Sequence, residues 1–192
     1  AQVEDVVATG TLPAKEVDVP GVLVDYVVKA KPEYHQQTFM TQYSPLLSNE
    51  IRTPKVRSQK LPLDNKTVIA RRAARELTPN SFINIGVGMA DKVARLINEA
   101  NLLDQYTLST DLGAIGGMTA SDYNYGTNYN ADAIINTLDM FDYYHGGGVD
   151  TTVLGFGQMD VNGNMNTTQI GDILIGPGGM IDIPASASKI IF

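Results

Sequence analysis

The sequence predicts an α/β protein in which an open, mainly parallel sheet carries helices on its faces. Apolar, β-branched runs at 81–86 and 106–110 have the composition of short buried strands. Between them lies a segment whose apolar residues recur at helical spacing. A strand, a helix and a strand in this order, with short connections, form a parallel pair covered by the helix. Most of the 18 glycines follow residue 85 and separate further short runs, so we expect a strand-rich second half.

Composition excludes several functional classes. The chain has 192 residues, 43% of them hydrophobic, which is enough for a substantial core. It has no cysteine and two distant histidines, so we expect no metal site. A net charge of −7 without a run of Lys or Arg argues against nucleic-acid binding. No apolar run approaches the roughly 20 residues of a membrane helix, and no signal peptide is recognisable. We therefore expect a soluble, cytoplasmic protein that has no membrane partner.

The two ends predict a piece of a longer polypeptide. The sequence has no initiator Met, and its last residues, SKIIF, form an apolar, strand-like run without a turn or cap. An exposed apolar strand end is an aggregation hazard. We expect this last strand to be unpaired in the 192-residue chain.

The first 63 residues predict one strand and one connector. Residues 19–30, VPGVLVDYVVKA, are β-branched, aromatic and nearly uncharged, which is typical of a buried strand. Residues 31–63 hold prolines at four positions and show no sustained period, which predicts an extended connector. This connector is either a solvated linker or an anion-binding segment, because it contains a group of cations: Arg52, Lys55, Arg57 and Lys60.

Two helices flank the first core strand. One follows Pro62, is capped by Asp64 or Asn65, and ends at Pro79. Its apolar face is expected to consist of Val68, Ile69, Ala73 and Leu77. The other begins in the glycine turn after residue 85, and its apolar positions are Met89, Val93, Leu96 and Ile97.

The remaining elements are short. Residues 131–136 predict a strand, and 138–148 predict a short helix that Asp139 caps and glycines end. Residues 149–167 predict a strand, an Asn-Gly turn and a strand. Residues 172–192 predict a strand, a glycine turn and the start of another element.

The stretch LSTDLGAIGG at 108–117 places Asp111 at a strand end and three glycines directly after it. An ordinary Asp turn explains this pattern. A carboxylate held where a substrate can approach the backbone closely explains it equally well. In that case Gly113, Gly116 and Gly117 are candidate ligand-binding positions.

Three further glycine turns have the same two interpretations. NIGVGMAD at 84–91 is either a tight strand-to-helix turn or an anion site, but it lacks the third glycine of a dinucleotide motif. IGPGGMID at 175–182 is either a β-turn or a loop whose N–H groups converge on an oxyanion. HGGG at 145–148 is a helix stop, or else His145 donates a proton there. The candidate binding positions are Gly86, Gly88, Gly146, Gly147, Gly176, Gly178 and Gly179.

Together, these turns and the strand-terminal carboxylate predict a ligand-binding crevice at the edge of an α/β sheet. The residues alone leave the ligand open, and a sugar-phosphate-binding domain is one alternative. However, no cationic cluster lies beside the glycine turns in the sequence.

Four motifs, in this order and spacing, resemble the family I coenzyme A transferases: STDLGAIGGM, AIINTLDMFDYYHGGGVD, LGFGQMDVNGNMN and IGPGGMIDI. Residues 22–54 resemble, more narrowly, the propionate CoA-transferases of that family. The resemblance covers nearly the whole chain. It implies the CoA-transferase fold and three parts: 1–30 as the end of a first half, 31–63 as the connector, and 64–192 as an incomplete second, catalytic half.

The resemblance also implies a mechanism and partners. A strand-terminal carboxylate attacks an acyl-CoA thioester, and an enzyme–CoA thioester follows. Asp111 occupies the position of this nucleophile, and Gly176, Gly178 and Gly179 occupy the loop associated with the oxyanion hole. Coenzyme A is then a substrate, and no cofactor is permanently bound. The implied partners are short-chain carboxylic acids such as acetate, propionate and lactate, the N-terminal half of the same polypeptide, and further copies in a homo-oligomer.

Two positions depart from the family pattern. The nucleophile of the family is Glu, whereas this chain has Asp111, which retracts the carboxylate by roughly 1.5 Å. Met180 stands where the loop of the family has Phe. The shorter carboxylate leaves a second hypothesis open, in which this half is catalytically impaired and serves CoA binding or assembly.

Overall fold

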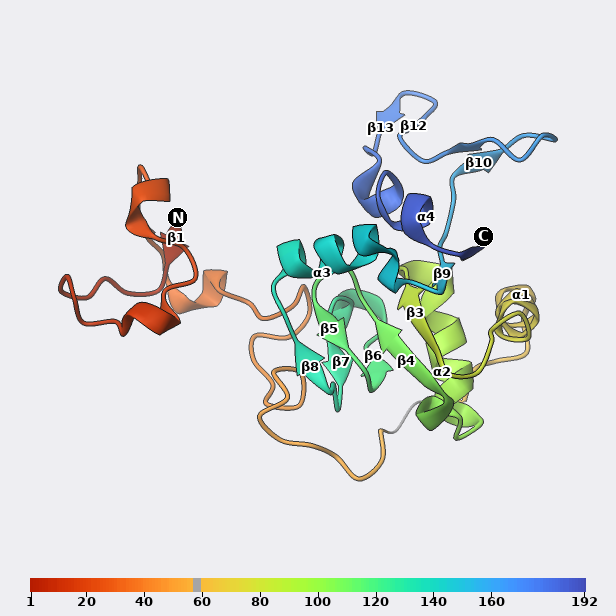
Figure 1. The fold of residues 1–192 in the computed structure, drawn as a ribbon, viewed down its shortest axis with the longest axis horizontal. Coiled ribbons are helices and arrows are strands. Elements are labelled where there is room, and N and C mark those ends of the chain that lie inside the picture. The colour runs from red at the N-terminus through yellow and green to blue at the C-terminus, as the bar shows by residue number, and fades with distance from the viewer. Residues whose placement is uncertain (57–59) are drawn as a thin grey trace. The chain divides into compact units, whose positions relative to one another are not determined.

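The computed structural model describes residues 1–56 and 60–192, so the predicted cation Arg57 lies outside the described residues. The Cα positions form two compact units, Ala1–Tyr43 and Ser44–Phe192. The second unit holds the central sheet and all four α-helices of the described chain (Figure 1).

The central sheet of the second unit has six strands in the order β14-β9-β3-β4-β5-β8. The first four are parallel, whereas β5 is antiparallel to β4 and β8 is antiparallel to β5. This arrangement confirms the mainly parallel α/β fold. The strands are β3 (Ser81–Ile85), β4 (Tyr106–Ser109), β5 (Ala114–Ile115), β8 (Ala133–Ile134), β9 (Thr151–Val153) and β14 (Lys189–Ile191).

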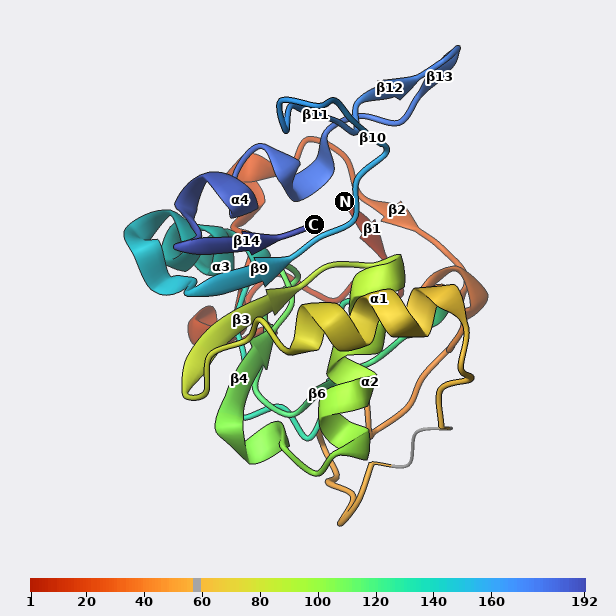
Figure 2. The same ribbon diagram turned by 90° about the vertical axis from the view of Figure 1, so that its right-hand side faces the viewer.

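Successive side chains of a strand point to opposite faces of the sheet, so both faces carry apolar side chains. Helices cover both of these faces. In β3, Ile83 and Ile85 lie in one core cluster with α1 (Asn65–Ala74) and α2 (Asp91–Glu99). Phe82 packs against the other cluster, which includes α3 (Thr137–Tyr143) and α4 (Ile183–Ser186). Figure 2 shows α1 and α2 together over β3 and β4.

The caps and faces of the helices differ in part from the prediction. The Asp64 side chain accepts a hydrogen bond from the Thr67 amide at 2.7 Å, which confirms one of the two predicted caps of α1. The helix ends at Ala74, before Pro79. Its buried residues are Thr67 and Ala70. Of the predicted apolar face, Ala73 and Leu77 pack in the core as expected, whereas Val68 and Ile69 are about half exposed, so the prediction was wrong for those two.

In α2 the predicted positions Val93 and Ile97 are buried, and the helix begins at Asp91 after a 3₁₀ turn at Gly88–Ala90. The predicted cap of the third helix was wrong. The α3 helix follows Asn136, and Asp139 lies inside its first turn.

The predicted buried strand at 19–30 was also wrong. This segment forms a 3₁₀ turn at Gly21–Leu23 and a two-residue strand, β2 (Val28–Lys29), that pairs in parallel with β1 (Gln2–Val3). Val22 is 90% exposed. A β-branched sequence needs an apolar layer over its sheet to become a buried strand. The first unit has only the two-stranded β1–β2 ribbon, and none of its apolar residues is fully buried.

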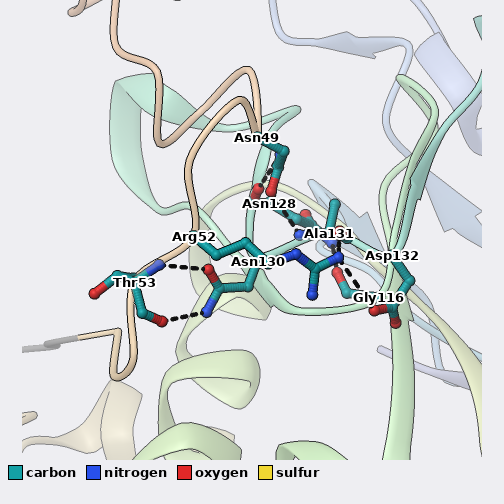
Figure 3. Close-up of polar contacts among 8 residues, drawn as sticks. All are labelled: Asn49, Arg52, Thr53, Gly116, Asn128, Asn130, Ala131 and Asp132. Carbon is teal, nitrogen blue, oxygen red and sulfur yellow. Dashed lines mark hydrogen bonds and ion pairs between the residues drawn. The ribbon is translucent and has the colours of Figure 1, made fainter.

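The connector is irregular, as expected, but residues 49–53 are anchored on the β7–β8 segment (Figure 3). The Arg52 guanidinium donates to the carbonyl oxygen of Ala131 at 2.8 Å. Thr53 and Asn130 exchange two hydrogen bonds, each of 2.9 Å. Arg52 therefore acts as a structural anchor, while Lys55 and Lys60 are exposed.

Short ribbons complete the chain. The hairpin of β10 (Gln158–Met159) and β11 (Met165–Asn166) confirms the predicted strand, turn and strand. The other antiparallel pairs are β6 (Met118–Thr119) with β7 (Asn128–Tyr129), and β12 (Gln169–Ile170) with β13 (Ile173–Leu174). The final apolar run forms β14, which pairs with β9, so the expectation of an unpaired last strand was wrong. Among the described residues, no helix has the length and apolar character needed to cross a membrane.

Candidate active site

The carboxyl ends of three neighbouring parallel strands meet at one edge of the sheet. Gly86 follows β3, Thr110 and Asp111 follow β4, and Leu154 follows β9. The registers of the β3–β4 and β3–β9 pairs bring these ends level. A cavity of about 500 Å³ opens there. Ligands of open α/β sheets bind beyond the carboxyl ends of the strands, so this cavity is the candidate active site.

The cavity is lined by glycines, apolar side chains, one carboxylate, one tyrosine and one threonine, Thr167. The lining residues that bear on its chemistry are Gly86, Asp111, Tyr125, Gly176, Gly178 and Gly179. The structure thus brings together the predicted nucleophile, the predicted oxyanion loop and one glycine of the 84–91 turn. These parts are up to 93 residues apart in sequence, from Gly86 to Gly179.

Asp111 is presented by a tight turn directly after β4. The strand residues before it, Ser109 and Thr110, are fully buried, and the Gly113 amide donates to the Thr110 carbonyl oxygen at 3.1 Å. Asp111 itself is partly exposed to the cavity. Its Oδ1 accepts a hydrogen bond from the Tyr125 hydroxyl at 2.8 Å.

The loop 176–180 faces this carboxylate from the other side. A Cβ added to Gly179 would lie 3.6 Å from Asp111 Oδ2, so the loop backbone passes close to the oxygen that Tyr125 leaves uncovered. Gly176 and Gly178 have φ of +86° and +53°, which favour glycine. Behind the loop, Met180 and Ile183 pack into the core cluster of α3 and α4, which holds the loop in place.

Tyr125 is a functional candidate that the sequence did not reveal. Burial, followed by the negative charge and the hydrogen bond of Asp111, raises the pKa of the Tyr125 hydroxyl well above its ordinary value. It therefore stays protonated and donates at neutral pH. A tyrosine fourteen residues beyond Asp111, in a segment that reads as a loop, gave no recognisable signal.

A buried polar network lies beneath the site. The Tyr144 hydroxyl is within 2.9 Å of Ser109 Oγ and accepts from Asn84 Nδ2 at 3.0 Å, and Thr152 Oγ1 donates to Asn84 Oδ1 at 2.8 Å. Burial is the main cause that raises the pKa of Tyr144 to about 12. The network ties β3, β4 and β9 to the helix after α3. The only sequence signal for it is the polar residues inside apolar strands.

Other predicted positions do not line the cavity. Gly113, Gly116 and Gly117 have positive φ, and a Cβ at each would lie within about 2 Å of Ile135 O, Asp132 Oδ2 and Tyr129 O, respectively. The absence of a side chain at these three positions thus allows close packing between the Asp111 turn and the β7–β8 segment. Gly88, Gly146 and Gly147 also lie outside the described lining. His145 pairs with Asp182 at 3.0 Å, which ties the helix end to the α4 segment.

No cluster of three or more His, Cys, Asp or Glu side chains suited to a metal ion occurs in the described part of the chain. The chemistry available in the cavity is that of a carboxylate, the hydroxyl groups of Tyr125 and Thr167, and a glycine-rich backbone.

Comparison with known proteins supports a specific family, although no family model matches the chain. A caffeate CoA-transferase from Acetobacterium woodii is 42% identical over 197 residues, covering 100% of this chain and 38% of the relative. A crystal structure of the acyl-CoA transferase YdiF apoenzyme from Escherichia coli O157:H7 matches with a TM-score of 0.80 and 36% identity, covering 100% of this chain and 35% of that one.

The chain is a homologue of the family I coenzyme A transferases. It spans a little over a third of the length of these relatives. A second structure of YdiF, described as a thioester complex with CoA, matches with a TM-score of 0.77 and 34% identity, covering 100% of this chain and 34% of that one.

Set beside this homology, the important outcome is that Asp111 and the 176–180 loop lie in one cavity. The sequence predicted that the glycine turns and this carboxylate share one crevice, but it did not show which of the turns take part. The structure selects Gly86 and the 176–180 loop and adds Tyr125 as a hydrogen-bond partner of the carboxylate. The catalytic role of Asp111 stays a prediction.

Proposed function

We propose that the protein carrying this chain transfers coenzyme A reversibly between short-chain acyl-CoA and free carboxylates, with Asp111 as the nucleophile. The observation that carries the proposal is the position of the Asp111 carboxylate, at a strand end inside the cavity and opposite the Gly178–Gly179 turn. Homology to enzymes named CoA-transferases supports the reaction class. Because the chain is a little over a third of those relatives in length, the activity belongs to the whole protein.

The proposed reaction begins when Asp111 Oδ2 attacks the thioester carbonyl carbon of acyl-CoA. The C–S bond breaks, CoA thiolate leaves, and a mixed anhydride forms. The thiolate then attacks the Asp111 carboxyl carbon and expels the first acid, which leaves an enzyme–CoA thioester. A second acid repeats these steps in reverse. Backbone N–H groups of the Gly178–Gly179 turn are the proposed oxyanion donors at the substrate carbon.

The finer assignments form part of the same proposal. Acetate, propionate and lactate are the proposed acids, following the resemblance of residues 22–54 to propionate CoA-transferases. Residues 1–30, 31–63 and 64–192 are proposed as the end of a first half, a connector and a second half. The protein is proposed to be a cytoplasmic homo-oligomer that holds no permanent cofactor.

The alternative is an impaired half that binds CoA or serves assembly, since Asp111 is one methylene shorter than the Glu of the family. The Tyr125 hydrogen bond of 2.8 Å favours the active interpretation, because a donor is in place for the shorter side chain. The two hypotheses differ in whether the carboxylate can reach the thioester carbon.

Trapping the intermediate tests the proposal. The complete protein is incubated with acetyl-CoA, treated with hydroxylamine or borohydride, and mapped by peptide mass spectrometry. We expect modification of Asp111 only after acyl-CoA is added, and none in Asp111→Asn. Modification of another carboxylate would contradict the assignment, and a protein that binds CoA without modification would support the impaired alternative.

The length of the nucleophile gives a second test. In an active site built for Asp, Asp111→Glu would move the carboxylate roughly 1.5 Å toward the loop and away from the donor geometry of Tyr125. We then expect kcat to fall by on the order of 100-fold while KM for acetyl-CoA changes little. A rise in kcat would instead indicate that Asp111 is an impaired nucleophile.

A further inference from the structure

The Tyr125 hydroxyl has two acceptors within reach. It lies 2.8 Å from Asp111 Oδ1 and 3.2 Å from the carbonyl oxygen of Ile85, at the end of the neighbouring strand. The two oxygens of Asp111 are thus distinct. Oδ1 is covered by Tyr125, whereas Oδ2 lies toward Gly179 and the open cavity.

The segment that carries Tyr125 is rigidly attached to the nucleophile turn. It connects β6 to β7, and the Ala120 amide donates to the Thr127 carbonyl oxygen at 2.9 Å. Thr110 Oγ1 donates to the Gly126 carbonyl oxygen at 3.3 Å. A Cβ on Gly126 would lie 2.2 Å from Leu112, so the hairpin packs directly on the turn. The ring is therefore held beside Asp111 by the backbone on both sides.

This geometry has a consequence for the second half of the proposed reaction. When CoA thiolate attacks the Asp111 carboxyl carbon, the electron pair of the C=O bond moves onto Oδ1. The tetrahedral intermediate collapses by breaking the bond to Oδ2, which leaves as an oxygen of the released acid. The S–C bond remains, and Oδ1 becomes the thioester oxygen again. Negative charge therefore develops at Oδ1, where the Tyr125 O–H is already placed.

We propose that Tyr125 is a catalytic hydrogen-bond donor that stabilises the oxyanion formed on the carboxyl group of Asp111 itself. This inference rests on the proposed nucleophilic role of Asp111. It assigns separate donors to two carbons, the Gly178–Gly179 turn for the substrate carbonyl and Tyr125 for the enzyme carboxyl. The Ile85 carbonyl oxygen keeps the hydroxyl oriented when Oδ1 is a neutral carbonyl oxygen and a weaker acceptor.

The raised pKa of Tyr125 fits this role, since the hydroxyl keeps its proton when a negative charge lies beside it. Removal of a hydrogen-bond donor that is aimed at a developing oxyanion commonly lowers kcat by 100- to 1,000-fold, because the dipole of the donor is already oriented. Loss of the hydroxyl should thus slow the steps at the enzyme carboxyl and leave acyl-CoA binding unaffected.

The test compares Tyr125→Phe with wild type in the complete protein, using acetyl-CoA and propionate. The enzyme–CoA thioester is followed by rapid quench and intact mass, and the burst amplitude counts active sites. We expect thioester formation and its consumption by propionate each to slow by about 100-fold per active site, with KM for acetyl-CoA within about threefold. The matched control is Tyr123→Phe, two residues away with a ring that is 68% exposed, which should behave as wild type.

The outcomes separate this inference from the proposed function. If wild type forms no thioester at Asp111, the proposed function fails. If wild type forms it and Tyr125→Phe is equally fast per active site, only the inference on Tyr125 is overturned. A purely structural role would reduce the burst amplitude or the melting temperature without slowing the rate per site.

Fluorinated tyrosines at position 125 keep the inference testable should Tyr125→Phe fail to fold. They retain the ring and the hydroxyl but change its acidity. We expect the rate of thioester formation to vary systematically with the acidity of the phenol. A rate independent of that acidity would overturn the proposal.

Discussion

The close approach of the loop to the nucleophile makes Gly179→Ala an informative substitution. The new methyl group would lie 3.6 Å from Asp111 Oδ2, on the open side of the carboxylate. A thioester carbon has to come within about 3–3.5 Å of the attacking oxygen, so the methyl group would occupy the space that this carbon needs. A displacement of about 1 Å from that position reduces the rate on the order of 100-fold.

The cost of this substitution to folding should be small. The same methyl group would lie 2.7 Å from Ile183 Cδ1, which is the end of a flexible side chain and can move aside. Overpacking of this kind costs about 1 kcal/mol at the low end of its range. For a domain of 150–250 residues this corresponds to a decrease in melting temperature of about 2–4 °C, and the decrease in the longer complete protein should be no larger than that. Activity and stability should thus respond very differently.

The assay combines the two measurements on the complete protein. Steady-state transfer from acetyl-CoA to propionate gives kcat, and calorimetry gives the melting temperature. Gly171→Ala is the matched control, because Gly171 lies outside the cavity lining, its Cβ would meet no atom within 4 Å, and its cost would come only from the φ of +58°. If Gly179→Ala kept its kcat within about threefold of wild type, the loop would not lie against the nucleophile during reaction, and the reasoning would fail.

Three further predictions concern stability. Tyr144→Phe should lower the free energy of unfolding by about 2 kcal/mol, since two buried hydrogen bonds are lost and the Asn84 Nδ2 donor loses its acceptor. Because the pKa of Tyr144 is raised in the folded state, wild-type stability should also fall between pH 10 and 12, and less so in the variant, as measured by urea denaturation at several pH values. Gly113→Ala should lower the free energy of unfolding by about 3 kcal/mol, because its Cβ would lie 1.9 Å from the Ile135 carbonyl oxygen. An unchanged melting temperature would contradict this prediction. Burial raises the pKa of Asp91, so its ionisation weakens folding as pH rises. Relative to wild type, Asp91→Asn should therefore be more stable at pH 7 than at pH 3 in chemical denaturation, and a difference independent of pH would contradict this.

The sequence determined the features that depend on neighbouring residues. The strands β3 and β4 are short, largely buried runs rich in β-branched and aromatic residues and are bounded by turn residues, and the helix between them repeats its apolar positions at helical spacing. This is enough to predict a parallel pair and to place Asp111 at a strand end. The glycine turns after β3 and at 175–180 could also be recognised in the sequence, because positive φ and close backbone approach require glycine.

Only the tertiary structure decided which turns share one cavity. Gly113, Gly116 and Gly117 looked like ligand positions, but their missing side chains make room for the β7–β8 segment. In the same way, the apolar run at 19–30 and the residues Val68 and Ile69 are exposed, although their composition is that of a core. Local pattern shows that a side chain is apolar or absent, but not which distant segment lies against it.

Tyr125 illustrates the same limit at the site itself. It contacts Asp111 because β6 and β7 form a hairpin that folds back on the turn after β4, and the 176–180 loop reaches the carboxylate only through the packing of Met180 and Ile183. These contacts join residues 14 and about 65 positions away from Asp111 in the chain. Such contacts depend on strand order and on the packing of whole elements, which no short stretch of sequence encodes.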